Sequence, residues 1–246
     1  MPDPTTLFVI LAVSAAAFLR GLAGFGFALA AVPILSLVLP PLQAVTLAIL
    51  LQLPIGGLDL VQLHRKVHRP SLIRLTLGSV LGTPLGLWGL TALSPDAARV
   101  LIGALVLLGL GLMLRYKPAQ PHPHGGLALA AGVASGAFSG LAAMPGPPAV
   151  AYYLGAGTTS AQTRASLLLF FFAASAMAVP GLWLAGAIDA AAVQLAVLTL
   201  GPMLLGTWAG GRAFARLEQA QYRKLALAIM ALSAVLAGGR GIIAWI

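Results

Sequence analysis

The sequence has 246 residues, of which 60% are hydrophobic and only 8% are charged. A soluble domain carries about 25% charged residues, so this composition excludes an ordinary soluble protein and predicts a polytopic membrane protein. The net charge of +9 comes from 14 basic and 5 acidic residues, and the basic residues gather in short loops between apolar segments. This distribution indicates membrane topology and argues against nucleic-acid binding. The chain has no cysteine, which excludes disulfides.

The first apolar segment, residues 7–39, is interrupted near its middle. As one helix it would be about 50 Å long, whereas the hydrocarbon core of a bilayer is about 30 Å thick. Gly21, Gly24 and Gly26 weaken the helix, and Arg20 places a cation at the break, where exposure to lipid would be costly. Such a break persists at membrane depth only if it is buried in protein or lines a cavity.

The remaining elements follow in chain order. A second broken apolar segment lies at residues 127–155, where Gly136–Pro148 interrupts it. The uninterrupted apolar stretches, each long enough for a full span, are 42–63, 75–93, 95–114, 165–188, 190–211 and 225–246. Ser94 precedes Pro95 and Asp96, a pattern typical of a helix N-terminus. Residues 64–74 form a basic loop.

The two halves of the chain resemble each other. Gly21–Leu35 matches Gly140–Leu154 at five of fifteen positions with a spacing of 119, and residues 82–101 match 206–225 at six positions with a spacing of 124. Similar spacings in two regions indicate an internal repeat. We therefore expect a single integral membrane domain, residues 1–246, with this order: repeat one 5–115, linker 116–125 and repeat two 126–246.

The positive charges predict how the segments cross the membrane. If both broken segments re-enter, eleven loop Lys and Arg residues lie inside and two outside, whereas the division is seven to six if every segment crosses. The first arrangement also makes the halves inverted. We therefore expect an all-α fold with two inverted repeats, each a re-entrant helical hairpin plus three transmembrane helices.

The broken segments also carry motifs of a known family. Gly21-Leu-Ala-Gly-Phe-Gly-Phe-Ala-Leu-Ala-Ala-Val-Pro-Ile-Leu35 and Ser139-Gly-Leu-Ala-Ala-Met-Pro-Gly-Pro-Pro-Ala-Val-Ala-Tyr-Tyr-Leu154 resemble the paired motifs of the sulfite exporter TauE/SafE family. The resemblance implies an exporter of a small anion, sulfite or an organosulfonate, in the bacterial inner membrane. The sequence has no ATP-binding motif, which favours a secondary transporter that works by alternating access.

The tips of the two hairpins form the predicted substrate site. Broken helices present unpaired N–H groups and positive half-helix ends, which favour anions. The alternative is that the glycines there only permit tight helix packing. The residues assigned to the site are Gly24, Phe25 and Gly26 at the first tip and Gly140, Met144, Pro145, Gly146 and Pro147 at the second.

Two arginines are further candidates for binding the substrate. The guanidinium of Arg20 can hold an oxyanion through two parallel hydrogen bonds. Its alternatives are capping carbonyls of the broken helix or reaching the membrane surface. The family more usually has an uncharged polar residue at this position, so Arg20 would then set specificity. Arg164 is either a ligand or a positive-inside anchor, and Gln52, Thr83 and Thr207 are weaker candidates for polar lining.

Asp59 is the one carboxylate within a predicted span. An acid at membrane depth is a functional candidate by default, here for proton coupling. Alternatively, Asp59 pairs with Arg65 or Arg69 near the membrane surface. We favour the second role, because Asp59 lies only five residues before His64, at the start of the basic loop.

No motif predicts an enzyme, a cofactor or a metal site. The chain has only four histidines and no cysteine, and no Ser-His-Asp set, Walker loop or dinucleotide fingerprint is present. The expected partners are a small anion and membrane lipids, and a homodimer is compatible with the sequence. The rival function is a lipid-headgroup scramblase or a membrane assembly factor. A tip cavity closed to lipid would favour a solute, and one open to lipid would favour the rival.

Overall fold

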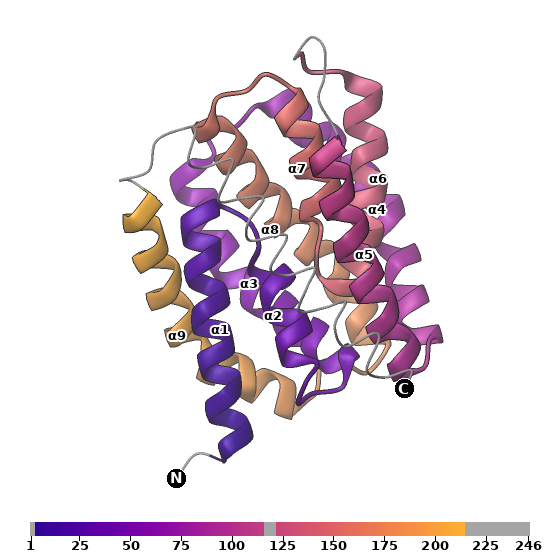
Figure 1. Ribbon diagram of the computed structural model, residues 1–246, viewed down its shortest axis with the longest axis vertical. Helices are drawn as coiled ribbons and strands as arrows, with labels where there is room; N and C mark the ends of the chain where they lie inside the picture. Colours follow the sequence, from indigo (N-terminus) through magenta and orange to yellow (C-terminus); the bar gives the residue numbers. More distant parts are fainter. Residues whose placement is uncertain (1–2, 116–121, 215–246) are drawn as a thin grey trace.

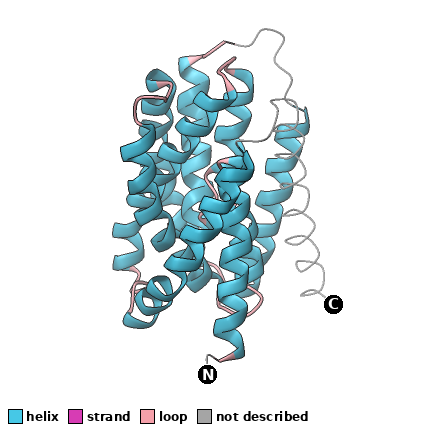
Figure 2. Cartoon of the chain, turned by 90° about the vertical axis from the view of Figure 1, so that its left-hand side faces the viewer, coloured by secondary structure: helices cyan, strands magenta, loops and turns pink. Residues whose placement is uncertain are grey.

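The computed structural model describes residues 3–115 and 122–214, and within these ranges all regular structure is helical (Figures 1 and 2). The helices described are α1 (Pro4–Ala23), α2 (Phe27–Leu35), α3 (Pro41–Leu63), α4 (Arg69–Ala92), α5 (Pro95–Arg115), α6 (Gly125–Ala142), α7 (Gly146–Gly155), α8 (Ser160–Leu184) and α9 (Ala190–Phe214). Six of these, α1, α3, α4, α6, α8 and α9, are long and apolar enough to cross a membrane. The prediction of a polytopic α-helical membrane protein is confirmed.

Some expected boundaries differ from those of the structure. Helix α4 begins at Arg69, inside the stretch that the sequence predicted as a basic loop, and α8 begins at Ser160. The expected helix start at Ser94 is present, because the Ala97 N–H donates to the Ser94 hydroxyl over 3.3 Å. The predicted last span, residues 225–246, lies outside the described residues, as does most of the predicted linker.

Both predicted breaks are present, and the helix before each break ends at a residue with left-handed backbone. Gly24 ends α1 with φ 77°, and Ala143 ends α6 with φ 55°. Each donates its N–H to the carbonyl four residues earlier, Gly24 to Arg20 and Ala143 to Ser139, over 2.7 Å in both cases. Gly24 and Ala143 are 119 positions apart, the spacing at which the two halves align. A left-handed alanine is uncommon, so the match reflects the shared design of the two breaks.

The chain reverses direction at each break. In Figure 1, α2 runs back toward the end of the bundle where α1 begins, and α7 runs back toward the end where α6 begins. These two ends are opposite. Each break therefore joins a long arm, α1 or α6, to a short arm, α2 or α7.

The long arm α6 packs against α4 at backbone contact. Glycines at four-residue spacing line both helices, at positions 78, 82 and 86 of α4 and 132, 136 and 140 of α6. A Cβ at Gly82 would overlap the carbonyl oxygen of Val133, and one at Gly140 would overlap that of Thr83. Small residues allow such close approach between helices in a membrane.

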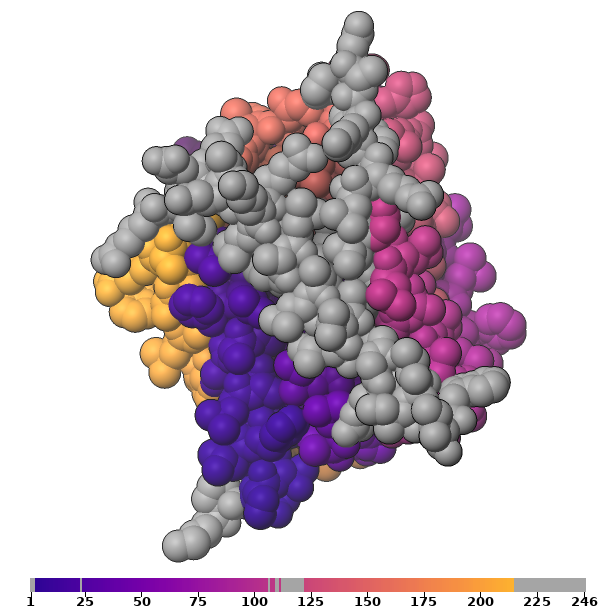
Figure 3. Space-filling model, in the orientation of Figure 1, coloured from indigo at the N-terminus to yellow at the C-terminus, as the bar shows by residue number. Residues whose placement is uncertain are grey.

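The other long arm, α1, packs on α9 in the same way. A Cβ at Gly21 would overlap the carbonyl oxygen of Thr207, and one at Gly210 would overlap that of Phe18. Helices α1 and α9 lie side by side on the face seen in Figure 3. Gly21 aligns with Gly140, and Gly210 with Gly86, so equivalent glycines make equivalent contacts in the two halves.

The first prediction concerns this packing. Gly82→Ala adds a methyl group where no space exists, so α4 and α6 must separate, at a cost of roughly 1–3 kcal/mol. Gly201→Ala in α9 is the matched control, because nothing lies within 4 Å of its Cβ position. Thermal unfolding in detergent should show a lower Tm for Gly82→Ala and an equal or higher Tm for Gly201→Ala. Equal Tm values for Gly82→Ala and the unmodified protein would contradict the backbone contact.

Candidate functional site

The tips of the two broken segments meet around a small cavity. It is lined by Arg20, Phe25–Leu29 and Gln52 from the first half and by Ala143–Gly146 and Phe171 from the second. All of these residues are buried. The space measures about 10 Å³, roughly what one water molecule requires. The tips are therefore closed upon each other in this conformation.

Equivalent positions of the two halves face the cavity together. Phe25, Gly26 and Phe27 correspond to Met144, Pro145 and Gly146 at the spacing of 119. Gln52 of α3 corresponds at the same spacing to Phe171 of α8. The charged and amide side chains, Arg20 and Gln52, come from the first half only. The cavity thus has a symmetric frame and a polar lining on one side.

The short arms direct their N-termini at this cavity. Gly26 is the N-cap of α2, and Pro145 is the N-cap of α7. The N–H groups in the first turn of α2 have no acceptor within the helix, and its residues Phe27–Leu29 line the cavity. In α7, Pro147 and Pro148 have no N–H to donate. The first tip therefore supplies most of the backbone donors, whereas the sequence predicted donors at both tips.

Arg20 joins this site from the last turn of α1. Its side chain is 4% exposed, so it remains inside the bundle and does not extend to the surface of the protein. The guanidinium Nη2 donates to the Oδ2 of Asp59 on α3, forming an ion pair. A buried guanidinium needs such a countercharge, because desolvation of a lone cation is costly.

The alternative partners expected for Asp59 are wrong. Arg65 and Arg69 lie in the turn after α3 and at the start of α4, and both are exposed. Asp59 instead pairs with Arg20, which is 39 positions earlier in the sequence. Exposed arginines are solvated and have little need of a countercharge, whereas the buried one requires it.

Arg164 of α8 lies against the end of α1. Its Nη2 donates to the Gly21 carbonyl over 2.9 Å, and its guanidinium lies 4.6 Å from the centre of the Phe214 ring. The carbonyls in the last turn of a helix receive no hydrogen bond from N–H groups of the helix itself. Gly24 leaves room for this side chain, since a Cβ there would overlap the Arg164 methylenes. Neither Gly24 nor Arg164 lines the tip cavity.

The other candidates also lie outside the cavity. Thr83 and Gly140 meet at the α4–α6 contact, and Thr207 meets Gly21 at the α1–α9 contact. Pro147 is buried in the first turn of α7. Of the predicted site residues, the structure brings together Arg20, Phe25, Gly26, Gln52, Met144, Pro145 and Gly146. It adds Phe27–Leu29, Ala143 and Phe171, and the alignment with Gln52 could have revealed Phe171.

A comparison with protein-family models decides the family. The model described as Sulfite exporter TauE/SafE matches residues 9–237, which include both breaks and the tip cavity. The chain belongs to the TauE/SafE sulfite exporter family. The resemblance drawn from the two motifs is thereby confirmed, and this TauE/SafE protein is a multi-pass membrane transporter. No curated protein and no solved structure matches it.

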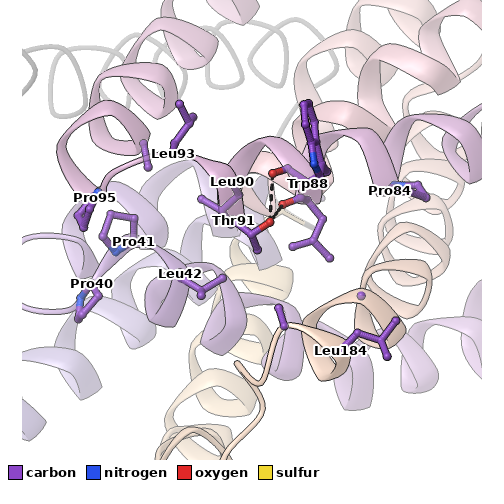
Figure 4. Close-up of a pocket in the computed structure, with 14 residues that line it drawn as sticks. Pro40, Pro41, Leu42, Pro84, Trp88, Leu90, Thr91, Leu93, Pro95 and Leu184 are labelled. Carbon is purple, nitrogen blue, oxygen red and sulfur yellow. Dashed lines mark hydrogen bonds between the residues drawn. The ribbon is translucent and has the colours of Figure 1, made fainter.

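Figure 4 shows a larger cavity of this TauE/SafE protein, which shares no lining residue with the tip cavity. Its volume is about 710 Å³, and its lining is almost entirely apolar, with no charged residue. The Thr91 hydroxyl there is engaged, since it donates to the carbonyls of Leu87 and Trp88 over 3.1 Å. This cavity therefore offers an anion no countercharge. In the described ranges, no three His, Asp or Glu side chains come together to hold a metal ion.

The second prediction concerns Arg164. Arg164→Gln removes the hydrogen bond to the Gly21 carbonyl, so it should cost roughly 1–3 kcal/mol of stability. Arg212→Gln is the matched control, because that guanidinium is exposed and stacks 3.9 Å from the centre of the Trp208 ring. In thermal unfolding in detergent, Arg164→Gln should therefore lower the Tm more than Arg212→Gln does. If Arg164→Gln lowered the Tm no more than Arg212→Gln, Arg164 would not stabilise the end of α1.

Proposed function

We propose that this TauE/SafE protein is a secondary transporter that exports a small anion, sulfite or an organosulfonate, across the bacterial inner membrane. The proposal is carried by the tip cavity, where a buried guanidinium and the N-terminus of α2 converge. Both features attract oxyanions, the first through charge-assisted hydrogen bonds and the second through free N–H groups and the helix dipole. Apart from the Gln52 amide, the other side chains of the lining are apolar, so few groups would recognise the charge of the anion.

We further propose that the protein consists of two inverted repeats, residues 5–115 and 126–246, and that α1–α2 and α6–α7 are re-entrant hairpins. The matched backbone at Gly24 and Ala143 supports this arrangement, as do the equivalent glycine contacts of α1 and α6. The opposite directions of the two hairpins in Figure 1 also support it. Each hairpin would then enter from one face of the membrane and present its tip at the midplane.

Because the tip cavity is small, the proposed mechanism requires the two tips to move apart. A space of about 10 Å³ holds roughly one water molecule and no sulfite. Substrate would enter only after the tips separate, from one face or from the other. Alternating access in this proposal consists of parting the tips on one side at a time.

The rival function, moving or handling lipid, receives less support. A lipid headgroup would need a polar site that opens sideways into the bilayer. The residues lining the tip cavity are all buried, and the larger cavity has no charged group for a headgroup. These observations favour a solute.

The third prediction tests the topology by labelling single cysteines, for which the cysteine-free chain is a ready background. With re-entrant hairpins, Gln162→Cys lies inside and Ala187→Cys outside, so an impermeant thiol reagent should label only Ala187→Cys in intact cells. Lys66→Cys is the control, because it lies inside in either arrangement. Labelling at position 162 with protection at position 187 would mean that the second broken segment crosses the membrane fully.

The fourth prediction tests the site. Purified protein in vesicles should transport labelled sulfite or a short sulfonate, and Arg20→Gln should weaken its apparent affinity about tenfold to a hundredfold, the value of a charge-assisted hydrogen bond. We also expect Arg20→Gln to change the preference among anions, since Gln is closer to the residue type usual in the family. Arg20→Lys should recover part of the affinity, because an ammonium lacks the two-pronged geometry.

Arg99→Gln is the control for this experiment. Arg99 also pairs with an aspartate, Asp96, over 2.7 Å, but at the exposed end of α5. Its loss should leave transport unchanged. If Arg20→Gln had the affinity and preference of the unmodified protein, Arg20 would not be a ligand. If the unmodified protein moved neither sulfite nor any sulfonate, the proposed substrate class would be wrong.

A further inference from the structure

The Arg20 side chain lines the tip cavity and also forms an ion pair outside it. Arg20 lines the tip cavity, yet its ion-pair partner, Asp59, does not line it. The Asp59 side chain is 16% exposed, compared with 4% for Arg20, so the carboxylate lies on the more accessible side of the pair. In this closed conformation the cation of the proposed site is therefore held by an anion of the protein itself.

The other acids that the structure describes are engaged elsewhere. Asp96 pairs with Arg99, and Asp189 accepts the Ala192 N–H over 2.7 Å at the start of α9. Asp3 is exposed beside the N-terminus. Within the described residues, Asp59 is thus the carboxylate that neutralises Arg20.

The charged groups around Asp59 also have other contacts. Helices α2, α5, α8 and α9 pack on α3, which carries Asp59, and α2 has no titratable residue. On α3 itself, the His64 ring lies 3.1 Å from the Leu60 and Val61 carbonyls. The described charged side chains on the packed helices contact these groups: Arg164 the Gly21 carbonyl, Arg212 the Trp208 ring, and Asp96 the guanidinium of Arg99. Arg20, from α1, is the group that meets the Asp59 carboxylate.

We propose that Asp59 competes with the transported anion for Arg20 and takes up a proton when the anion displaces it. This inference rests on the proposed function, because it assumes that an anion binds at the tips. A carboxylate and a sulfonate or sulfite both bind guanidinium N–H groups, and Asp59 occupies the Nη2 of Arg20 in the closed conformation. A carboxylate that loses its cation in a poorly solvated interior takes a proton rather than keep its charge.

The charges balance in this exchange. Before binding, the site holds the Arg20 cation and the Asp59 carboxylate. After binding, it holds the Arg20 cation, the bound anion and the neutral carboxylic acid of Asp59, whose proton comes from water. One proton is taken up for each monovalent anion, so the two would cross the membrane together without net charge. When both leave, the ion pair forms again and restores the closed site.

The test measures protons directly on the unmodified protein. Methanesulfonate is a suitable probe, because it stays monovalent throughout the accessible pH range and cannot itself take up the proton. Calorimetric titration in buffers of different ionisation enthalpy should show about one proton taken up per anion bound. By linkage, the Kd should then rise up to about tenfold for each pH unit. Methanesulfonate binding without proton uptake would overturn this inference and leave the proposed anion site standing.

Variants of Asp59 give a second, independent measurement. Asp59→Asn removes the competing charge and keeps an amide oxygen for Arg20, so methanesulfonate should bind about tenfold more tightly at pH 7 and with no proton uptake. Asp59→Glu should retain proton uptake. Asp96→Asn, in the exposed Asp–Arg pair, is the control and should behave as the unmodified protein does. Weaker binding by Asp59→Asn would mean that Asp59 positions Arg20 and does not compete for it.

If the unmodified protein bound neither methanesulfonate nor sulfite at any pH, the proposed function would fail, and this inference would fail with it. That outcome differs from binding without proton uptake, so the two failures are distinguishable. The titration of the unmodified protein also keeps the test decisive if Asp59→Asn does not fold.

Discussion

Two helices, α1 and α6, end inside an apolar bundle, and the rest of the structure depends on how their ends are satisfied. Backbone groups released by a break must find partners there, because lipid offers none. The ends of the long arms are closed by the protein itself, through the N–H groups of Gly24 and Ala143 and through Arg164 on the Gly21 carbonyl. The beginnings of the short arms instead face the tip cavity. The breaks thus leave donors, not acceptors, for a ligand, which is why an anion suits the site.

The glycine contacts connect the two halves at the same time. Each long arm is packed against a helix of the other half, α6 on α4 and α1 on α9, at distances that leave no space for a side chain. A movement of one hairpin is therefore tied to a helix of the opposite half. The tips meet between these two packed pairs, where Arg20 and Gln52 provide the polar groups. The broken segments thus pack through their glycine-lined faces and present the proposed anion site at their tips.

Much of this could be predicted from the sequence, because segment length and glycine content reveal where a helix breaks. The sequence also placed Arg20, Phe25, Gly26 and Met144 at one site, and the structure brings these four residues together around the tip cavity. It could not separate packing glycines from tip glycines: Gly140 lies within α6 against α4, whereas Gly146 begins α7 at the tip cavity. The partner of Asp59 could also not be predicted from the sequence, because a contact between α1 and α3 depends on the rotation of both helices.

The central claim is that an oxyanion binds between the two tips. Selenite resembles sulfite and scatters X-rays anomalously, so crystals grown with selenite would locate the anion directly. We expect a selenium peak in the tip cavity, within hydrogen-bonding distance of Arg20 and of the first-turn N–H groups of α2, with the tips parted to make room. An ordered selenite bound elsewhere, with the tips closed and Arg20 still on Asp59, would contradict this claim.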